Sequence, residues 1–315
     1  MRDEKTRELL IDNMKGYGTI LVFLGHSFLG GVRDTSQWAN WLFNVIYCFH
    51  MPLFFLINGY LLSNKTTLSR AVIWKKFSKM MIPYYWGIIS VEIIKPLILG
   101  QWTNWRGVWK EIFLLSGNGW FLSTLFLVNV IVIGLLKYDK RVLYLLLPIC
   151  LILSQQIEID IFRIDRIVKY LPYYVIGIMI KRGKDKGLKI IKKRIIFVAS
   201  LFIILIMGRT PNEWTIINFF ISFCGIYCIY YLSAVKGYKV IEYFGQNSIM
   251  ALTIPNLFLF DLIQMFLDFF NICDDWLIIV FSFILQVIGS ILILQLLKKS
   301  KLLSCLYGVS CCNKM

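Results

Sequence analysis

The two histidines of this 315-residue chain, His26 and His50, both lie within strongly apolar stretches of sequence. Imidazole is the side chain whose unperturbed pKa lies nearest to neutrality, so it can act as a general base at physiological pH. A titratable group inside a membrane-spanning segment is costly and usually has a role in function. Both histidines are therefore candidate catalytic residues. The alternative, that each only hydrogen-bonds a neighbouring helix, stays open.

Lys15 precedes His26 by eleven residues, and this spacing places both side chains on one face of a helix. The separation is about three turns, with an offset of ~20° and about 16 Å along the axis. A lysine at the cytosolic surface can hold the phosphates of a soluble acyl carrier, while a histidine near the middle of the membrane removes the proton of an acceptor hydroxyl. The pair therefore favours acyl transfer. Alternatively, Lys15 only extends its charged end to the membrane surface and binds no ligand.

The second apolar segment is expected to bring His50 to the depth of His26, because the two segments cross the membrane in opposite directions. Pro52 removes a backbone donor and predicts a kink in this helix. Asn58 and Gly59 follow toward the cytosolic end of this segment. Asn58 supplies a polar amide, and Gly59 predicts a close contact with another helix.

The composition identifies an integral membrane protein. Hydrophobic residues make up 58% of the chain and the mean hydropathy is +0.69, whereas soluble domains are only ~45–50% apolar. We predict an all-α, polytopic integral membrane protein with about ten transmembrane helices and no separate soluble domain. The single predicted domain covers residues 1–315. The predicted spans are 16–33, 38–62, 80–100, 119–136, 141–156, 166–181, 194–208, 214–235, 246–270 and 275–297.

The basic residues divide unequally between alternate loops. With a cytosolic N-terminus, 26 of the 34 Lys and Arg residues lie in cytosolic segments and 8 lie at the outer face. This distribution follows the positive-inside rule and predicts a multi-pass protein of the bacterial cytoplasmic (inner) membrane with both termini in the cytosol. The net charge of +16 then reflects topology and contact with membrane lipids, and no nucleic-acid partner is expected. No removable signal peptide is predicted at the N-terminus.

Two further groups could bind a substrate. Lys75, Lys76 and Lys79 form a basic cluster at the cytosolic end of the third span. Trp120 begins the fourth span, next to an outer loop at 101–118 that could form an extracytoplasmic entrance. The alternatives are a topological role for the cluster and an interfacial anchor for Trp120. Most of the eight cysteines lie inside apolar segments, where they are expected to be buried small hydrophobic residues, and the group Cys305, Cys311 and Cys312 has no histidine nearby, so no metal is expected.

Five segments, taken in order, resemble the signature of the membrane acyltransferase-3 family, and within it the fucose 4-O-acetylase-like branch of bacterial glycan O-acetyltransferases. They are IDNMKGYGTILVFLGHS, FHMPLFFLINGYLL, KKFSKMMIPYY, GWFLSTLF and FGQNSIM. The resemblance covers residues 11–255, and the first two segments together are the most specific part of it.

The resemblance implies an enzyme that transfers an acyl group, usually acetyl from acetyl-CoA, to a hydroxyl of a sugar or of a lipid-linked glycan. The family's basic residue falls on Lys15, its first histidine on His26 and its second histidine on His50. Its interfacial basic cluster falls on Lys75, Lys76 and Lys79.

Three positions depart from the family pattern. Lys15 stands where many members have arginine, which keeps the charge but loses the planar guanidinium. Asn58 replaces the usual serine and preserves polarity. Pro255 stands where many members have a histidine, so this chain must act without that group or have an altered substrate.

The sequence therefore predicts a membrane O-acyltransferase that uses acetyl-CoA as donor and a cell-surface or exported polysaccharide, or its lipid-linked precursor, as acceptor. We expect His26 to be the general base and His50 to orient or position the acyl group. The residues expected to bind CoA phosphates are Lys15, Lys75, Lys76 and Lys79, and those expected to bind the acceptor are Asn58 and Trp120.

Two other classes stay open at this point. A transporter or flippase for glycan or acyl intermediates would also need polar groups at the membrane midplane, although no internal repeat is present in the sequence. An inactive scaffold or sensor is the other alternative, because of Lys15 and Pro255. The sequence also leaves self-association into a homo-oligomer open.

Overall fold

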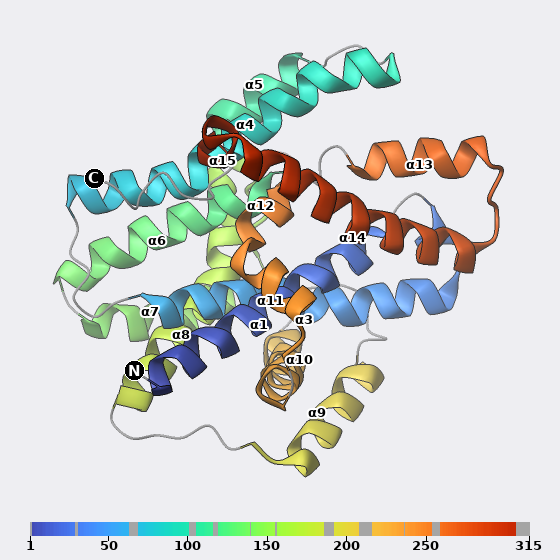
Figure 1. The fold of residues 1–315 in the computed structure, drawn as a ribbon. Coiled ribbons are helices and arrows are strands. Elements are labelled where there is room, and N and C mark those ends of the chain that lie inside the picture. Colours follow the sequence, from blue (N-terminus) through green and yellow to red (C-terminus); the bar gives the residue numbers. More distant parts are fainter. Residues whose placement is uncertain are drawn as a thin grey trace. The chain divides into compact units, whose positions relative to one another are not determined.

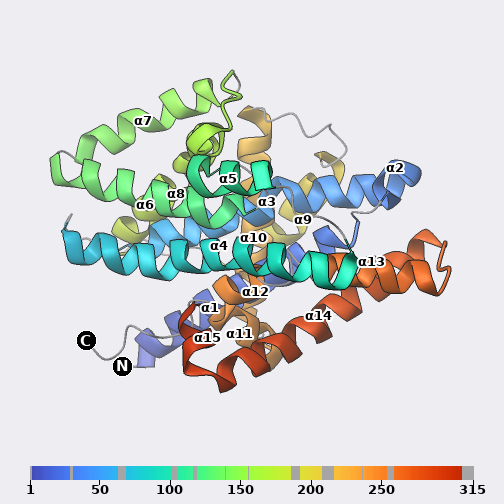
Figure 2. The same ribbon diagram turned by 90° about the horizontal axis from the view of Figure 1, so that it is seen from above.

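The computed structural model describes residues 2–28, 31–62, 69–100, 105–115, 119–138, 140–154, 156–185, 192–207, 216–235, 237–253 and 259–306. Regular secondary structure in these residues is entirely helical (Figure 1, Figure 2). The elements are α1 (Arg2–His26), α2 (Val32–Thr35), α3 (Gln37–Leu61), α4 (Arg70–Leu99), α5 (Trp105–Leu114), α6 (Trp120–Tyr138), α7 (Lys140–Leu153), the 3-10 helix η1 (Ile161–Arg163), α8 (Ile164–Asp185), α9 (Arg194–Met207), α10 (Ile216–Val235), α11 (Lys239–Gln246), α12 (Ser248–Thr253), α13 (Phe260–Phe269), α14 (Asp275–Lys299) and α15 (Lys301–Leu306). The predicted all-α class is confirmed.

Four of the described helices, α3, α6, α10 and α14, are long and apolar enough to cross a membrane. α14 is buried on a polar face, which carries Ser282, Gln286 and Ser290, and exposes apolar side chains such as Ile288 and Leu296. A polar buried face and an apolar exposed face are the reverse of the pattern in soluble proteins and are typical of a helix surrounded by lipid. The membrane class is thus confirmed, while the number of spans stays a prediction.

The helix bounds differ from the predicted spans in four places. α1 ends at His26 rather than continuing to residue 33, and α4 begins at Arg70, ten residues before the predicted span. The predicted outer loop at 101–118 contains a helix, α5. The predicted span 246–270 is divided between α12 and α13, and Pro255 lies outside the described residues. Hydropathy averaged over a window detects apolar runs but not the ends or interruptions of the helices inside them.

The chain divides into two compact units, of which the first comprises Met1–Leu61, Tyr173–Ser248 and Gln264–Val287. In this unit α1 packs against α3, α10 and α11. Glycines make the close contacts between α1 and α11, where Gly16 faces the carbonyl oxygen of Ile241 and Gly245 faces that of Asp12. A Cβ atom at either glycine would overlap the facing backbone, so this helix crossing requires both glycines.

The second unit comprises Leu62–Pro172, Ile249–Ile263 and Ile288–Met315. In this unit α6 packs against α4 and α7, and α5 packs against α4. The hydroxyl of the buried Tyr84 donates a hydrogen bond to the carbonyl oxygen of Glu111 at 2.6 Å. Because Tyr84 is halfway along α4, this bond ties α5 back to the middle of that helix.

Candidate active site

α1 is continuous from Lys15 to His26, so the two residues share one face of the helix, as their spacing predicts. Thr19 lies between them on the same face and is completely buried. Its hydroxyl donates to the carbonyl oxygen of Lys15 at 3.0 Å. The stripe therefore runs from a basic group at the predicted cytosolic side, through a hydroxyl, to an imidazole.

His26 is the last residue of α1 and is partly exposed. The sequence predicted it in the interior of a longer helix, so this position is a correction. The carbonyl groups of the last helical turn carry the negative end of the helix dipole. A histidine at this end is well placed to act as a base, because the dipole stabilises the imidazolium that forms when the ring takes up a proton.

His50 is buried in α3, and the helix continues through Pro52. Its Nδ1 lies 2.8 Å from the carbonyl oxygen of Ile46. A carbonyl oxygen can only accept, so Nδ1 carries the proton and Nε2 is the acceptor nitrogen of the neutral ring. The ring packs edge-on against Tyr47, with ring centroids 4.6 Å apart. The pairing of His50 with His26 stays a prediction.

A hydrogen-bonded pair that the sequence reasoning missed lies beside His26. The buried Gln286 of α14 donates from Nε2 to the Oγ of Ser27 at 3.1 Å. The Ser27 hydroxyl in turn donates to the carbonyl oxygen of Phe23 at 3.0 Å. These bonds tie the C-terminal turn of α1 to α14 and so fix the backbone that carries His26. An amide in the middle of the apolar segment of α14 was the signal available in the sequence.

Lys15 is half-buried and forms an ion pair with Asp12, one turn earlier in α1, at 3.4 Å between Nζ and Oδ1. The sequence analysis did not assign a role to Asp12. Because the pair is partly open to solvent and its distance is long, the lysine can exchange this carboxylate for a phosphate at little cost.

Asn58 lies on α3 and its side chain donates to the carbonyl oxygen of Phe54 at 2.9 Å, within its own helix. Gly59 faces the carbonyl oxygen of Tyr174 in α8, where a Cβ atom would overlap it. The predicted close helix contact at Gly59 is therefore present. One amide N–H of Asn58 is used within its own helix, so its second N–H and its carbonyl oxygen are left to meet a ligand without breaking that bond.

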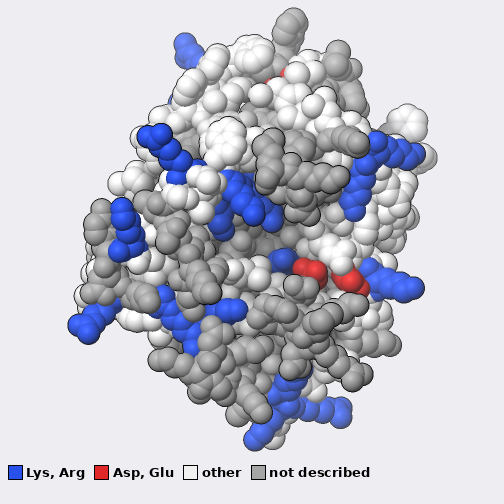
Figure 3. Space-filling view, turned by 60° about the vertical axis from the view of Figure 1, so that its left-hand side comes forward, with Lys and Arg blue, Asp and Glu red and all other residues white. Residues whose placement is uncertain are grey.

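The three lysines of the basic cluster differ in their surroundings. Lys75 and Lys79 are exposed on the first turns of α4. Lys76 is half-buried, and its Nζ donates to the Oδ1 of the buried Asn129 of α6 at 2.8 Å. Burial, and then the charges of Lys79 and Lys75, lower the pKa of Lys76 to about 8. On the molecular face drawn in Figure 3, basic side chains are spread in separate groups and acidic ones are few.

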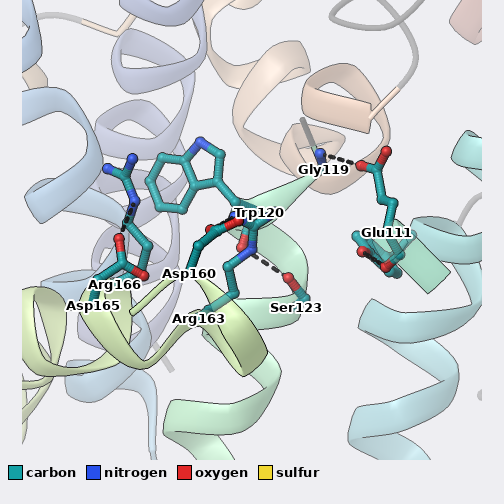
Figure 4. Close-up of polar contacts among 9 residues, drawn as sticks. Glu111, Gly119, Trp120, Ser123, Asp160, Arg163, Asp165 and Arg166 are labelled. Carbon is teal, nitrogen blue, oxygen red and sulfur yellow. Dashed lines mark hydrogen bonds and ion pairs between the residues drawn. The ribbon is translucent and has the colours of Figure 1, made fainter. Parts of the chain in front are cut away.

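Trp120 begins α6 and is half-buried in the second unit. Tyr170 stacks on its ring with centroids 5.4 Å apart, and the guanidinium of Arg166 lies 4.9 Å from the ring centroid. Arg166 forms an ion pair with Asp165 (Figure 4). Trp120 is therefore part of a polar and aromatic cluster and not only an anchor at the membrane surface.

Arg163, one of the eight basic residues predicted at the outer face of the membrane, is buried and paired with Asp160. Phe162 and Arg163 both have positive φ values, of 52° and 57°, which side chains other than glycine rarely adopt. Left-handed backbone of this kind persists where the surrounding contacts impose it and is frequent at functional sites. Sequence periodicity carries no signal for such a turn.

Among the described residues, no group of three or more His, Cys, Asp or Glu side chains is arranged to hold a metal ion. The Pro255 position that departs from the family pattern lies outside the described residues, so its effect on the site stays a prediction.

The fold defines a helical membrane protein, and a histidine and a lysine share one face of its first helix. The family profile described as an acyltransferase domain matches residues 9–295. The chain belongs to the acyltransferase-3 family of membrane proteins.

One curated relative is the nodulation protein NolL of Sinorhizobium fredii, which is 35% identical over 125 residues. The match covers 37% of this chain and only 33% of the length of NolL. No solved structure matches the chain.

Proposed function

We propose that this enzyme transfers an acetyl group from acetyl-CoA to a hydroxyl of a cell-surface or exported polysaccharide, or of its lipid-linked precursor. The observation that carries the proposal is the stripe on α1, where Lys15 and His26 share one face of a continuous helix in an acyltransferase-3 chain. We also propose that the chain belongs to the fucose 4-O-acetylase-like branch of the family. We place it in the bacterial cytoplasmic membrane, with both termini in the cytosol.

In the proposed reaction His26 removes the proton of the acceptor hydroxyl while the oxygen attacks the thioester carbonyl. The C–S bond then breaks, and the CoA thiolate leaves with the proton that the imidazolium returns. The C-terminal end of α1 stabilises the imidazolium between these steps. General base catalysis of this kind contributes ~10²–10⁴-fold, and positioning of the two substrates supplies the rest.

The cationic side chains are proposed to hold the donor. Lys15 can exchange its partly exposed Asp12 partner for a CoA phosphate. Lys75 and Lys79, exposed on α4, can add to the attraction. His50, with Nδ1 donating to its own helix, keeps Nε2 as an acceptor that can orient the substrate hydroxyl.

The test is the O-acetyl content of the surface glycans of the host, measured by NMR. The cells compared carry the intact protein, no protein, or His26→Ala at equal membrane abundance. Loss of the acetyl signal to the same extent in the last two strains is the expected result. An acetyl signal that survives in all three strains would refute acetylation of that glycan and favour a transport function.

A further inference from the structure

The described part of the second unit holds a concentration of polar side chains that the proposed step at His26 does not use. We define it as the Trp120 cluster, which consists of Glu111, Trp120, Asp160, Arg163, Asp165 and Arg166, labelled in Figure 4, together with Tyr170. We propose that the Trp120 cluster binds an uncharged pyranose ring of the acceptor. This inference rests on the proposed function, because it requires a sugar acceptor.

The indole of Trp120 is held by two residues of α8. Tyr170 stacks on it with an interplanar angle of 14°, and Arg166 lies over the same ring system. Arg166 and Tyr170 are four residues apart in α8, so they approach the indole from the same helix face. The ring of Trp120 also contacts that of its neighbour Phe121, edge-on with centroids 6.2 Å apart. A tryptophan fixed in this way offers a flat apolar surface on which the C–H groups of a sugar ring can pack.

The charged groups beside the indole differ widely in exposure, from one buried arginine to a mostly exposed aspartate. The side chain of Arg163 is 4% exposed, Asp165 23%, Arg166 37% and Asp160 59%. Carboxylates accept and guanidinium groups donate hydrogen bonds in fixed planes. Neighbouring hydroxyls of a pyranose both donate and accept, so they can bind to an adjacent carboxylate and guanidinium at once.

Asp165 provides an unused acceptor. Its Oδ2 pairs with the Nε of Arg166 at 3.1 Å, whereas its Oδ1 is buried and has no hydrogen-bond partner in the described part of the chain. A buried carboxylate oxygen without a donor is costly and requires an explanation. A hydroxyl group of a bound sugar would supply the missing donor.

The pairing of charges in the cluster argues for an uncharged ligand. Each arginine already has an aspartate partner, Arg163 with Asp160 and Arg166 with Asp165. A phosphate or a uronate would have to displace a carboxylate and would be repelled by the others. Arg163 acts here as a positioning residue, because it is buried in a left-handed turn and holds Asp160 at the rim.

The test is steady-state kinetics of the purified full-length enzyme, with acetyl-CoA as donor. The acceptor probe is the surface polysaccharide isolated from cells that lack this protein. Asp165→Asn and Trp120→Ala should each raise the acceptor KM roughly 10- to 100-fold, as expected for loss of a charge-assisted hydrogen bond or a ring contact. The KM for acetyl-CoA should change less than about twofold. Trp120→Phe should recover part of the affinity.

Lys137→Ala and Leu145→Ala are controls, since these residues are exposed on α6 and α7 outside the cluster. They should leave the acceptor KM unchanged. An unchanged acceptor KM in Asp165→Asn and Trp120→Ala would overturn the inference while leaving acetyl transfer itself intact. Absence of transfer by the unaltered enzyme would instead refute the proposed function.

Competition tests the uncharged class directly. Neutral methyl hexopyranosides should inhibit transfer to the polysaccharide, and sodium salts of hexuronic acids at equal concentration should inhibit it much less. Stronger inhibition by the uronates would overturn the proposed class. Inhibition by neutral sugars that is the same for Asp165→Asn as for the unaltered enzyme would place the sugar elsewhere.

Discussion

Lys76 differs from its neighbours because it is half-buried and hydrogen-bonded to Asn129, with a pKa lowered to about 8. If its ammonium attracts the donor, CoA affinity should fall as pH rises from 7 to 9, because the protonated form that binds phosphate is lost. We expect a decrease of roughly fivefold, which corresponds to about 1 kcal/mol for one partly exposed contact. Calorimetric titration with CoA measures it.

Lys76→Arg supplies the control for this prediction, since a guanidinium stays protonated across the range. The variant should bind CoA with little pH dependence. Lys75→Ala, which removes an exposed charge, should lower affinity and leave the pH dependence in place. An equal pH dependence in the unaltered enzyme and in Lys76→Arg would show that Lys76 does not bind the donor.

Gln286 should affect catalysis through the backbone of α1. Gln286→Leu keeps the approximate volume but removes the bond to Ser27, so the C-terminal turn that carries His26 loses its tie to α14. We expect kcat to fall about tenfold, as for a modest loss of alignment, with the KM for acetyl-CoA unchanged. Ser282→Ala is the control, one turn away on the same buried face. A Gln286→Leu enzyme with normal kcat would contradict this role.

These residues also show how far sequence reasoning reaches. The shared face of Lys15 and His26 follows from helix geometry alone, and it holds because α1 is unbroken between them. The partnership of Ser27 and Gln286 joins positions 259 residues apart, which no local spacing can reveal. The roles of His26, His50 and the lysines remain predictions, because geometry does not establish function.

At the scale of helices, the crossing of α1 and α11 depends on Gly16 and Gly245. Gly245→Ala would place a Cβ atom against the carbonyl oxygen of Asp12 and force the helices apart. We expect a loss of about 1–3 kcal/mol in stability, measured as a lower Tm in detergent, together with reduced acyl transfer. Gly134→Ala in α6 is the control, because a Cβ atom there meets open space and should leave Tm unchanged or higher. Equal Tm values for the two variants would show that the crossing tolerates separation.

The same helices explain which elements could be predicted. α3, α10 and α14 coincide closely with predicted spans because each is a long apolar run between polar ends. α5 and α11 were not expected, since both are short helices with polar residues among the apolar ones. Their positions follow from tertiary contacts, such as the bond from Tyr84 to Glu111, and not from local hydropathy.

For the whole molecule, orientation in the membrane is testable with a native cysteine. Cys273 is exposed in the short connection between α13 and α14, on the predicted outer side. A membrane-impermeant maleimide should label it in intact spheroplasts, and Cys273→Ser should abolish that labelling. After lysis the Cys273→Ser protein should become labelled, because Cys311 and Cys312 follow the predicted last span on the cytosolic side. Full labelling of Cys273→Ser in intact spheroplasts, with no increase after lysis, would place the C-terminus outside. It would also reverse the side from which Lys15 meets the donor.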